Sequence, residues 1–428
     1  MELGKDKPGS RVLAVALPLS IGVGVAILAG AVLRARMKRR RWGKQVRDFE
    51  WGRHNSSSAG MHDFSFFPGL PEKLEYKDIM AATQGFSMKI GSGGYGTVYK
   101  GTLVDRTDVA VKRLDCSGAE AKREFLTEIA AISRIHHVNL VGLKGFCIHR
   151  GQRFLVYEYM NQGSLDRTLF HGEPVMEWKE RFKIALGTAR GLEYLHTCCE
   201  HKIIHCDVKP ENILLHDNLQ VKVSDFGLSK LLTREQSGFF TLMRGTRGYI
   251  APEWLTNTAI SEKTDVYSYG MVLLEIVSGK KNFFLQPDCD YDGNSPFSEY
   301  EHRQVNFPLC ALEMHLERRY LELVDPRIMG RVTCEEVEKL VRVALCCVHQ
   351  DPNLRPSMSD VVRMLEGLQA LAEPRTESLN FLKFYDPAAL VENNVEREVV
   401  LQRQETSYPK VPKNSFSHMS SQQVSGPR

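Results

Sequence analysis

A short polar segment at residues 205–212, HCDVKPEN, constrains this chain more than any other feature. Within one loop, Asp207 can accept the proton of an acceptor hydroxyl, Lys209 can neutralise charge on a transferring phosphate, and Asn212 can hold a magnesium ion. The turn DFG follows, and its Asp225 supplies a second magnesium ligand. Any fold of this chain must therefore bring these two polar segments together around a phosphate.

A glycine-rich segment, GSGGYGTV at residues 91–98, offers a place for phosphate oxygens, because glycines let the backbone approach and donate its N–H groups. A dinucleotide-binding loop would run directly into a helix. Here a second β-like run follows instead and ends in VAVK at 109–112. Lys112 can reach the α- and β-phosphates from this strand. Glu128 can pair with it, and Glu124, one turn earlier, is the alternative partner.

The period of apolar residues changes once along the chain. Strand-like runs occur at 97–100, 108–113 and 153–159, with one helical stretch at 119–135. After residue 164 the period is mainly helical, at 178–197, 263–278, 333–349 and 357–371. We therefore predict an α+β chain with a strand-rich small lobe at 85–160, a helix-rich large lobe at 161–372 and a cleft between them.

An apolar run at 12–33 carries no charge, and a helix of this length spans a bilayer at about 1.5 Å per residue. The basic segment at 34–44 follows it, so the positive-inside rule places later residues in the cytosol. We predict a single-pass protein of the plasma membrane with a short extracytosolic N-terminus at 1–11. A basic juxtamembrane linker at 34–84 and a disordered polar tail at 373–428 complete the chain.

A cleaved signal peptide is the alternative for this run, because AGA at 29–31 fits a cleavage site. The product would then be a secreted binding protein, with the sequon at 55–57 open to glycosylation. Ten cysteines without a CxxC pair indicate free thiols in a reducing compartment instead. The formal net charge of +4 on 428 residues is too mild to indicate nucleic-acid binding.

The order and spacing of these motifs resemble those of the eukaryotic protein kinases, including the closing triplet APE at 251–253. Lys209 and Thr246 are typical of the serine/threonine branch. AATQGFS at 81–87 and IHHVNLV at 135–141 are similar to plant receptor-like kinases. The closest resemblance is to the lectin-type (S-domain) group, which often reads HCDxKPENILL.

This resemblance implies the bilobal protein kinase fold, ATP in the cleft, Mg²⁺ between phosphates and protein, and protein substrates with serine or threonine acceptors. It implies that Asp207 and Lys209 are catalytic and that Asn212 and Asp225 bind the metal. It implies further that Asp265 anchors the catalytic loop and that Glu253 pairs with Arg355. The nucleotide contacts it implies are Ile90, Gly91, Gly93, Gly96, Val98, Ala110, Lys112, Glu128, Glu158, Met160 and Leu214.

The chain departs from the family pattern at Cys206, where an arginine usually precedes the catalytic aspartate. In kinases with that arginine, a phosphate on the activation segment neutralises it and orders the segment. Phosphorylation of Thr233, Ser237, Thr241 or Thr246 is therefore not expected to gate this chain in the ordinary way. We expect activity that is constitutive or set by partners.

A second departure is that only 11 residues precede the predicted membrane span, whereas the receptor family carries a large ectodomain. We therefore expect the chain to act with a separate receptor or to be a truncated member of the family. A homodimer is a further expected arrangement, in which small residues such as Ser20 and Gly24 can pack two helices together. A signalling scaffold with little catalysis is the other hypothesis. The presence of Lys112, Asp207 and Asp225 favours an active enzyme.

The segment DCDYDGNSPFSE at 288–299 matches the spacing of a calcium-binding EF-hand loop by letter. Pro287 stands directly before it, Pro296 lies inside it, and Ser295 stands where an apolar residue normally pairs two loops. A polar insertion between helices of the large lobe is therefore the favoured interpretation.

Overall fold

The computed structural model describes residues 71–383, except 94–95, 115–118, 134, 234–235, 237, 241–244, 257 and 287–302. It divides the chain into two compact units, residues 1–380 and 381–428, and the elements that build the site lie in the first. The predicted membrane helix at 12–33 and the predicted tail beyond residue 383 fall outside the described residues. Within the described part, no helix is long and apolar enough to span a bilayer.

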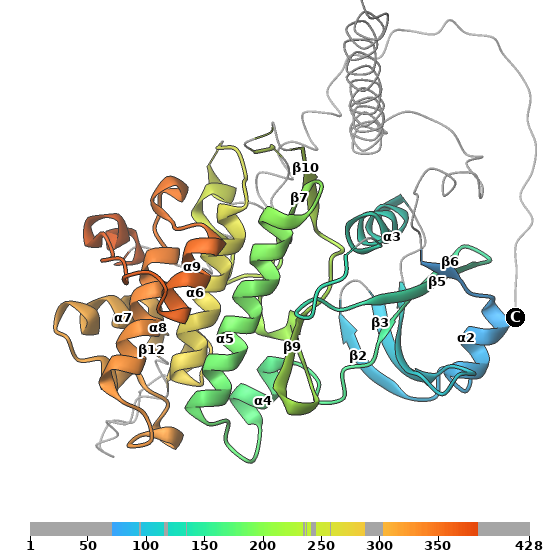
Figure 1. The fold of residues 1–428 in the computed structure, drawn as a ribbon, viewed down its shortest axis with the longest axis horizontal. Helices are drawn as coiled ribbons and strands as arrows, with labels where there is room; N and C mark the ends of the chain where they lie inside the picture. The colour runs from blue at the N-terminus through green and yellow to red at the C-terminus, as the bar shows by residue number, and fades with distance from the viewer. Residues whose placement is uncertain are drawn as a thin grey trace, which may run out of the picture. The chain divides into compact units, whose positions relative to one another are not determined.

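The smaller lobe is built on a six-stranded sheet in the order β1-β5-β6-β4-β3-β2 (Figure 1). Neighbouring strands pair antiparallel except β1 and β5, which run parallel. The elements are β1 (Glu72–Lys73), β2 (Lys89–Gly93), β3 (Gly96–Thr102), β4 (Asp108–Leu114), β5 (Leu143–His149), β6 (Gln152–Glu158) and helix α3 (Ala119–Ile132). The three predicted strands and the predicted helix of this lobe are thereby confirmed.

A strand and a helix that precede the predicted small lobe also belong to it. Helix α2 (Tyr76–Ala82) buries Ile79 in an apolar cluster with Val109 of β4 and Phe154 of β6. The last part of the predicted linker at 34–84 is therefore folded against the sheet. A helix of seven residues is too short to show a clear helical period, so the sequence pattern did not reveal it.

The larger lobe is mainly helical and packs around α6 (Lys263–Ser278), whose residues 264–278 are all buried. Its other α-helices are α4 (Leu165–His171), α5 (Trp178–Glu193), α7 (Phe307–Leu316), α8 (Cys334–Cys347) and α9 (Met358–Glu366), with a π-helical turn at Tyr194–Cys198. Three two-stranded sheets accompany them: β7 (Lys202–Ile204) with β10 (Lys230–Leu232), β8 (Ile213–His216) with β9 (Gln220–Val223), and β11 (Phe283–Gln286) with β12 (Arg303–Asn306). The predicted α+β chain with a strand-rich and a helix-rich lobe is confirmed.

The last α-helix is shorter than its apolar period predicted. A capping box between Ser357 and Asp360 begins α9, and Gly367 ends it in a left-handed conformation with φ 78°. Glycine adopts that conformation without a steric penalty, so the helix predicted to reach residue 371 stops at Glu366. A 3-10 helix at Thr376–Lys383 follows where the disordered tail was predicted to begin.

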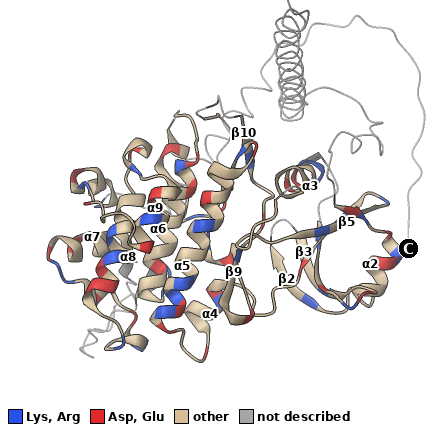
Figure 2. Ribbon diagram, viewed as in Figure 1, with Lys and Arg blue, Asp and Glu red and all other residues tan. Residues whose placement is uncertain are grey.

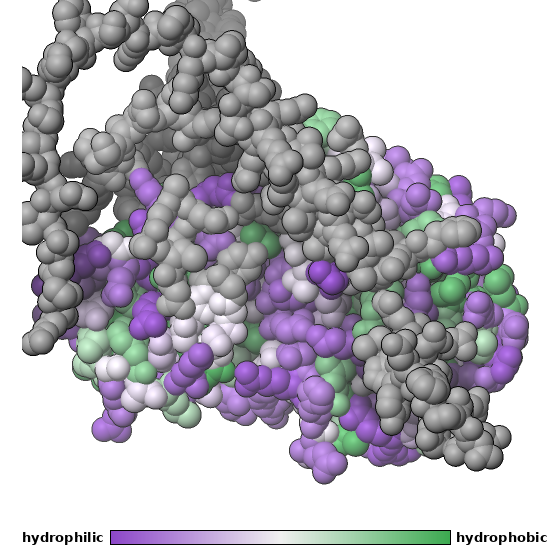
Figure 3. Space-filling model, turned by 180° about the vertical axis from the view of Figure 1, so that it is seen from behind, coloured by the Kyte–Doolittle hydropathy of each residue, from purple (hydrophilic) through white to green (hydrophobic). Residues whose placement is uncertain are grey.

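Charged and apolar residues are intermixed on the parts of the described surface that Figures 2 and 3 show. Charged residues of both signs are spread over both lobes (Figure 2). Seen from behind, apolar residues form separate areas among hydrophilic ones (Figure 3). The residues that carry chemistry gather instead where the strands of the small lobe meet the loops before α6.

Candidate active site

Lys112 lies at the centre of a buried ion cluster formed by three separate elements. Its Nζ lies 3.1 Å from Glu128 Oε2 of α3 and 2.8 Å from Asp225 Oδ1 of the DFG turn. Of the two glutamates that the sequence left open, Glu128 is the one that pairs with Lys112. Burial opposes ionisation of Asp225, but the Lys112 ammonium beside it holds the pKa of that carboxyl below its usual value. The cluster therefore presents a cation and a carboxylate side by side in the charged state.

Tyr157 is a member of this cluster that sequence reasoning missed. Its hydroxyl donates a hydrogen bond to Glu128 Oε1 from the end of β6. Burial and the neighbouring Glu128 carboxylate raise the pKa of Tyr157, so the phenol stays protonated and remains a donor. The signal available in the sequence was a tyrosine inside an apolar strand, directly before Glu158, one of the expected nucleotide contacts.

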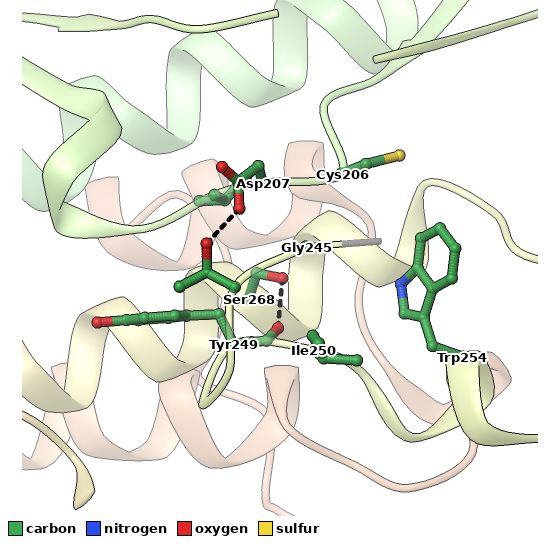
Figure 4. A pocket seen from close by; sticks show the side chains of 9 residues that line it. Cys206, Asp207, Gly245, Tyr249, Ile250, Trp254 and Ser268 are labelled. Carbon is green, nitrogen blue, oxygen red and sulfur yellow. Dashed lines mark hydrogen bonds between the residues drawn. The ribbon is translucent and has the colours of Figure 1, made fainter. Parts of the chain in front are cut away.

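Asp207 is held in place by three side chains. Thr246 Oγ1 donates to Asp207 Oδ1 at 2.7 Å, a hydrogen bond that Figure 4 marks with a dashed line at Asp207. Lys209 Nζ lies 2.8 Å from Asp207 Oδ2. Lys209 also donates to Thr246 Oγ1 at 2.6 Å, and Asn212 Nδ2 donates to Asp207 Oδ2 at 3.0 Å. The loop thus brings together all the residues that the HxDxKxxN pattern assigned to it, and Thr246 joins them from the activation segment.

Asp265, at the start of α6, anchors this loop as expected. Its buried carboxylate accepts hydrogen bonds from the backbone N–H groups of His205 at 2.7 Å and Cys206 at 2.8 Å. These bonds hold Cys206 at φ 67°, a left-handed conformation that non-glycine residues rarely adopt. His196 Nε2, in the π-helical turn, lies 2.9 Å from Asp265 Oδ2, a contact that the sequence did not reveal because the two residues are 69 positions apart.

Cys206 is buried, and its sulfur points away from Asp207 (Figure 4). Burial raises the pKa of the Cys206 thiol, so the side chain is neutral at physiological pH. It lines a pocket together with its neighbour Asp207 and with Gly245, Tyr249 and Trp254. No cation stands at this sequence position to meet a phosphate.

Four of the apolar residues expected to contact the nucleotide lie on strands of two different sheets. Ile90, Val98 and Ala110 are half-buried apolar residues of β2, β3 and β4, and Leu214 is a half-buried residue of β8. Met160 is buried two positions after the end of β6. These side chains have the exposure that the walls of an apolar slot require.

The glycines of the expected phosphate loop lie on β2 and β3, and residues 94–95 between them are outside the described residues. Gly91 and Gly93 belong to β2. Gly96 adopts φ 144°, and a Cβ there would lie 2.2 Å from the carbonyl oxygen of Arg113. Only glycine fits this position, so its presence is required by the hairpin as well as by any nearby phosphate.

Asn212 and Asp225 are suited to bind a magnesium ion together with phosphate oxygens. The carbonyl oxygen of Asn212 accepts from both the N–H and the hydroxyl of Ser224, at 2.8 and 3.0 Å, and Ser224 directly precedes Asp225. Among the described residues, no group of three His, Cys, Asp or Glu side chains is placed to hold a metal. Amide and carboxylate oxygens suit a hard cation that keeps phosphate ligands, so the two residues fit Mg²⁺ in a complex with a nucleotide. The EF-hand-like segment at 288–299 lies outside the described residues.

The activation segment ends in a buried ion pair, which confirms the expected partnership of Glu253 and Arg355. Arg355 Nη1 and Nη2 each lie 2.7 Å from a different oxygen of Glu253, so the pair is bidentate. Thr264 of α6 donates to the same carboxylate at 3.1 Å. This arrangement fixes the end of the segment that begins at Asp225.

Glu275 of α6 is a second buried carboxylate beside the activation segment. The single Tyr249 O–H donates to this carboxyl and lies 2.9 and 3.0 Å from its two oxygens, and the backbone N–H of Asn282 donates to it at 3.0 Å. Burial is the main cause that raises the pKa of Glu275 to about 8. The carboxyl is therefore mainly protonated at neutral pH.

This raised pKa predicts a specific pH dependence of stability. The folded state holds the Glu275 proton up to about pH 8, whereas the unfolded chain releases it near the ordinary value of 4.5. The stability that the raised pKa of Glu275 contributes is therefore fully present below pH 4.5 and is lost as the pH rises through about 8. Glu275→Gln keeps a neutral side chain of the same shape, so its stability relative to wild type should rise between pH 5.5 and pH 9. Urea unfolding at the two pH values measures this difference, and parallel profiles would contradict it.

The comparisons with known proteins agree with this geometry. The family model described as "Protein kinase domain" matches residues 85–365. A G-type lectin S-receptor-like serine/threonine-protein kinase of Arabidopsis thaliana is 54% identical over an alignment of 402 residues, which covers 90% of this chain and 45% of that protein.

Two further relatives show the same relation. The G-type lectin S-receptor-like serine/threonine-protein kinase SD2-5 of Arabidopsis thaliana is 48% identical over 321 residues, covering 74% of this chain and 37% of its own length. The G-type lectin S-receptor-like serine/threonine-protein kinase LECRK4 of Oryza sativa subsp. indica is 43% identical over 314 residues, covering 73% of this chain and 37% of its own length. The chain thus spans less than half the length of each of these relatives.

Proposed function

We propose, from the premise that this chain belongs to the protein kinase family and to its receptor-like serine/threonine branch, that it transfers the γ-phosphate of ATP to serine and threonine hydroxyls of proteins. The observation that carries the proposal is the pair of ion clusters described above. Lys112 contacts both Glu128 and Asp225, and Asp207 is held at the same time by Lys209 and Thr246. A chain that served only as a scaffold would have no need of both clusters.

ATP with Mg²⁺ would supply the phosphoryl group and the positive charge that balances its transfer. Asp207 would orient the acceptor hydroxyl and accept its proton, while Thr246 and Lys209 keep the carboxylate in place. Lys112, braced by Glu128, would hold the α- and β-phosphates, and Asn212 and Asp225 would bind the metal. Positioning and electrostatic stabilisation account for most of the rate in this type of reaction.

We further propose that the chain is anchored in the plasma membrane through residues 12–33, with the kinase lobes in the cytosol. The uncharged run and the basic segment after it support this proposal, as does the similarity of the chain to S-receptor-like kinases. A partner receptor or a second copy of this chain would supply the signal. The neutral, buried thiol of Cys206 cannot bind a phosphate on the activation segment, which supports control by such partners.

Magnesium-dependent phosphate transfer by the full chain in detergent tests the central proposal. The acceptors are the chain itself and a generic basic protein, and phosphoamino-acid analysis identifies the product. We expect phosphoserine and phosphothreonine from the wild type, and a loss of about 10²-fold or more from Asp207→Asn, which removes the proton acceptor. Absence of transfer by a wild-type chain that binds ATP would refute the catalytic function.

A further inference from the structure

We propose that Glu158 and Lys222 form a positioning pair that raises the affinity of the site for ATP. The pair would hold the segment that leaves the small lobe against the strand that leads to Asp225. This inference rests on the function proposed above. The side chain of Glu158 then has a role separate from the adenine contact expected of that residue.

The ion pair joins the end of β6 to β9. Glu158 Oε1 lies 2.8 Å from Lys222 Nζ and accepts a hydrogen bond from the backbone N–H of Gly142 at 2.6 Å. Lys222 Nζ also donates to the carbonyl oxygen of Leu140 at 3.4 Å. Residues 140 and 142 precede β5, so three separate segments of the chain meet at one carboxylate and one ammonium.

Backbone hydrogen bonds join the same three segments beside the ion pair. The N–H of Val141 donates to the carbonyl oxygen of Val223 at 3.0 Å, and the N–H of Glu158 donates to that of Gly142 at 3.1 Å. A Cβ on Gly142 would lie 3.2 Å from Glu158 Oε1, which is tighter than an ordinary contact. The absence of a side chain at Gly142 therefore lets the carboxylate approach closely.

Because this pair is partly buried, its loss should cost more free energy than the loss of an ion pair on the surface. The side chain of Lys222 is only 11% exposed and that of Glu158 is 27% exposed. An ammonium with so little access to water depends on its carboxylate for compensation. Exposed pairs of the same residue types contribute little, because water and salt screen them.

The pair connects two sides of the expected ATP site. Lys222 pairs directly with Leu214 across the β8–β9 ladder and precedes Asp225 by three residues. Glu158 precedes Met160 by two residues. The ion pair is formed in the same conformation in which Lys112 contacts Asp225. Without it, only the backbone hydrogen bonds would join the two sides, and ATP binding would have to restore their arrangement at a cost in affinity.

The test measures ATP affinity and turnover in the full chain. Displacement of a fluorescent ATP analogue gives the Kd for ATP without requiring turnover, and initial rates give KM for ATP and kcat. Lys222→Met should raise both Kd and KM about 5- to 20-fold, within the usual range for coupled sites. The change in kcat at saturating ATP should be less than about threefold, because a bound nucleotide restores the arrangement. A purely structural defect would lower kcat through loss of folded enzyme and leave KM unchanged.

Three further variants make the assignment specific. Glu158→Gln should also raise Kd, and the double variant should be no worse than Lys222→Met alone, because both changes remove one interaction. Lys222→Arg retains the positive charge and should restore the Kd to within about threefold of wild type. Lys202→Met is the matched control: it removes a Lys–Glu pair of 2.9 Å with 26% and 23% exposed side chains, in which both partners belong to the large lobe. It should leave the Kd unchanged.

An unchanged Kd in Lys222→Met, additive effects in the double variant, or tighter ATP binding after loss of the pair would overturn the proposal. If the wild type transfers no phosphate, the proposed function fails. The Kd measurements then still decide whether the ion pair supports nucleotide binding.

Discussion

Lys112→Met is expected to reduce phosphate transfer by about 10²- to 10³-fold, the usual loss when one preorganised electrostatic group is removed from an active site. Methionine approximates the length of the lysine side chain but carries no charge. The variant would lack the contact with the α- and β-phosphates proposed above. It would also leave Glu128 and Asp225 without the cation that lies between them. Burial already raises the pKa of Glu128 and the Lys112 cation opposes that rise, so the variant should raise this pKa further and favour the neutral carboxyl.

Transfer rates at saturating ATP, together with melting temperatures, check this prediction. Lys100→Met is the matched control, because Lys100 lies on the neighbouring strand β3 and pairs with Asp108 near the surface at 3.1 Å. It should change the rate by less than about twofold, since partly exposed ion pairs contribute little. A near-normal rate for Lys112→Met would show that Lys112 is not required for transfer.

Arg355→Met is expected to destabilise the protein by about 3–5 kcal/mol, the usual cost of removing one partner of a buried ion pair. Both Arg355 and Glu253 are buried, and the variant leaves the Glu253 carboxylate without its bidentate partner. It also removes the hydrogen bonds that Arg355 donates to the carbonyl oxygens of His349 and Lys263, at 2.8 and 2.9 Å. For a domain of this size the melting temperature should fall by about 10 °C.

Thermal and urea unfolding measure this loss, with Arg190→Met as the control. Arg190 pairs with Glu366 on the exposed surface at 2.6 Å, so its loss should cost less than about 1 kcal/mol. Adding Glu253→Gln to Arg355→Met should recover part of the lost stability, because no buried charge then remains unpaired. Equal melting temperatures for wild type and Arg355→Met would contradict the assignment of this pair to the stability of the large lobe.

The two lobes were predictable because their elements repeat a period over many residues. The helical period at 263–278 coincides with α6, and the strand-like alternation at 108–113 lies within β4. Helix α2 escaped prediction because seven residues do not establish a period. Helix α9 ended early because the left-handed conformation of Gly367 overrides the apolar pattern beyond it.

The sequence alone determined which residues are available to bind the phosphates and the metal and to accept the proton. The fixed spacing of HCDVKPEN places Asp207, Lys209 and Asn212 in one loop, because local chain geometry keeps close neighbours together. The choice of Glu128 over Glu124 required the orientation of α3 against β4, which no local rule specifies. Tertiary structure alone brought Tyr157 to Glu128, and it alone paired Glu158 with Lys222. These partners lie 29 and 64 residues apart in the sequence, so only the packing of complete elements decides that their side chains meet.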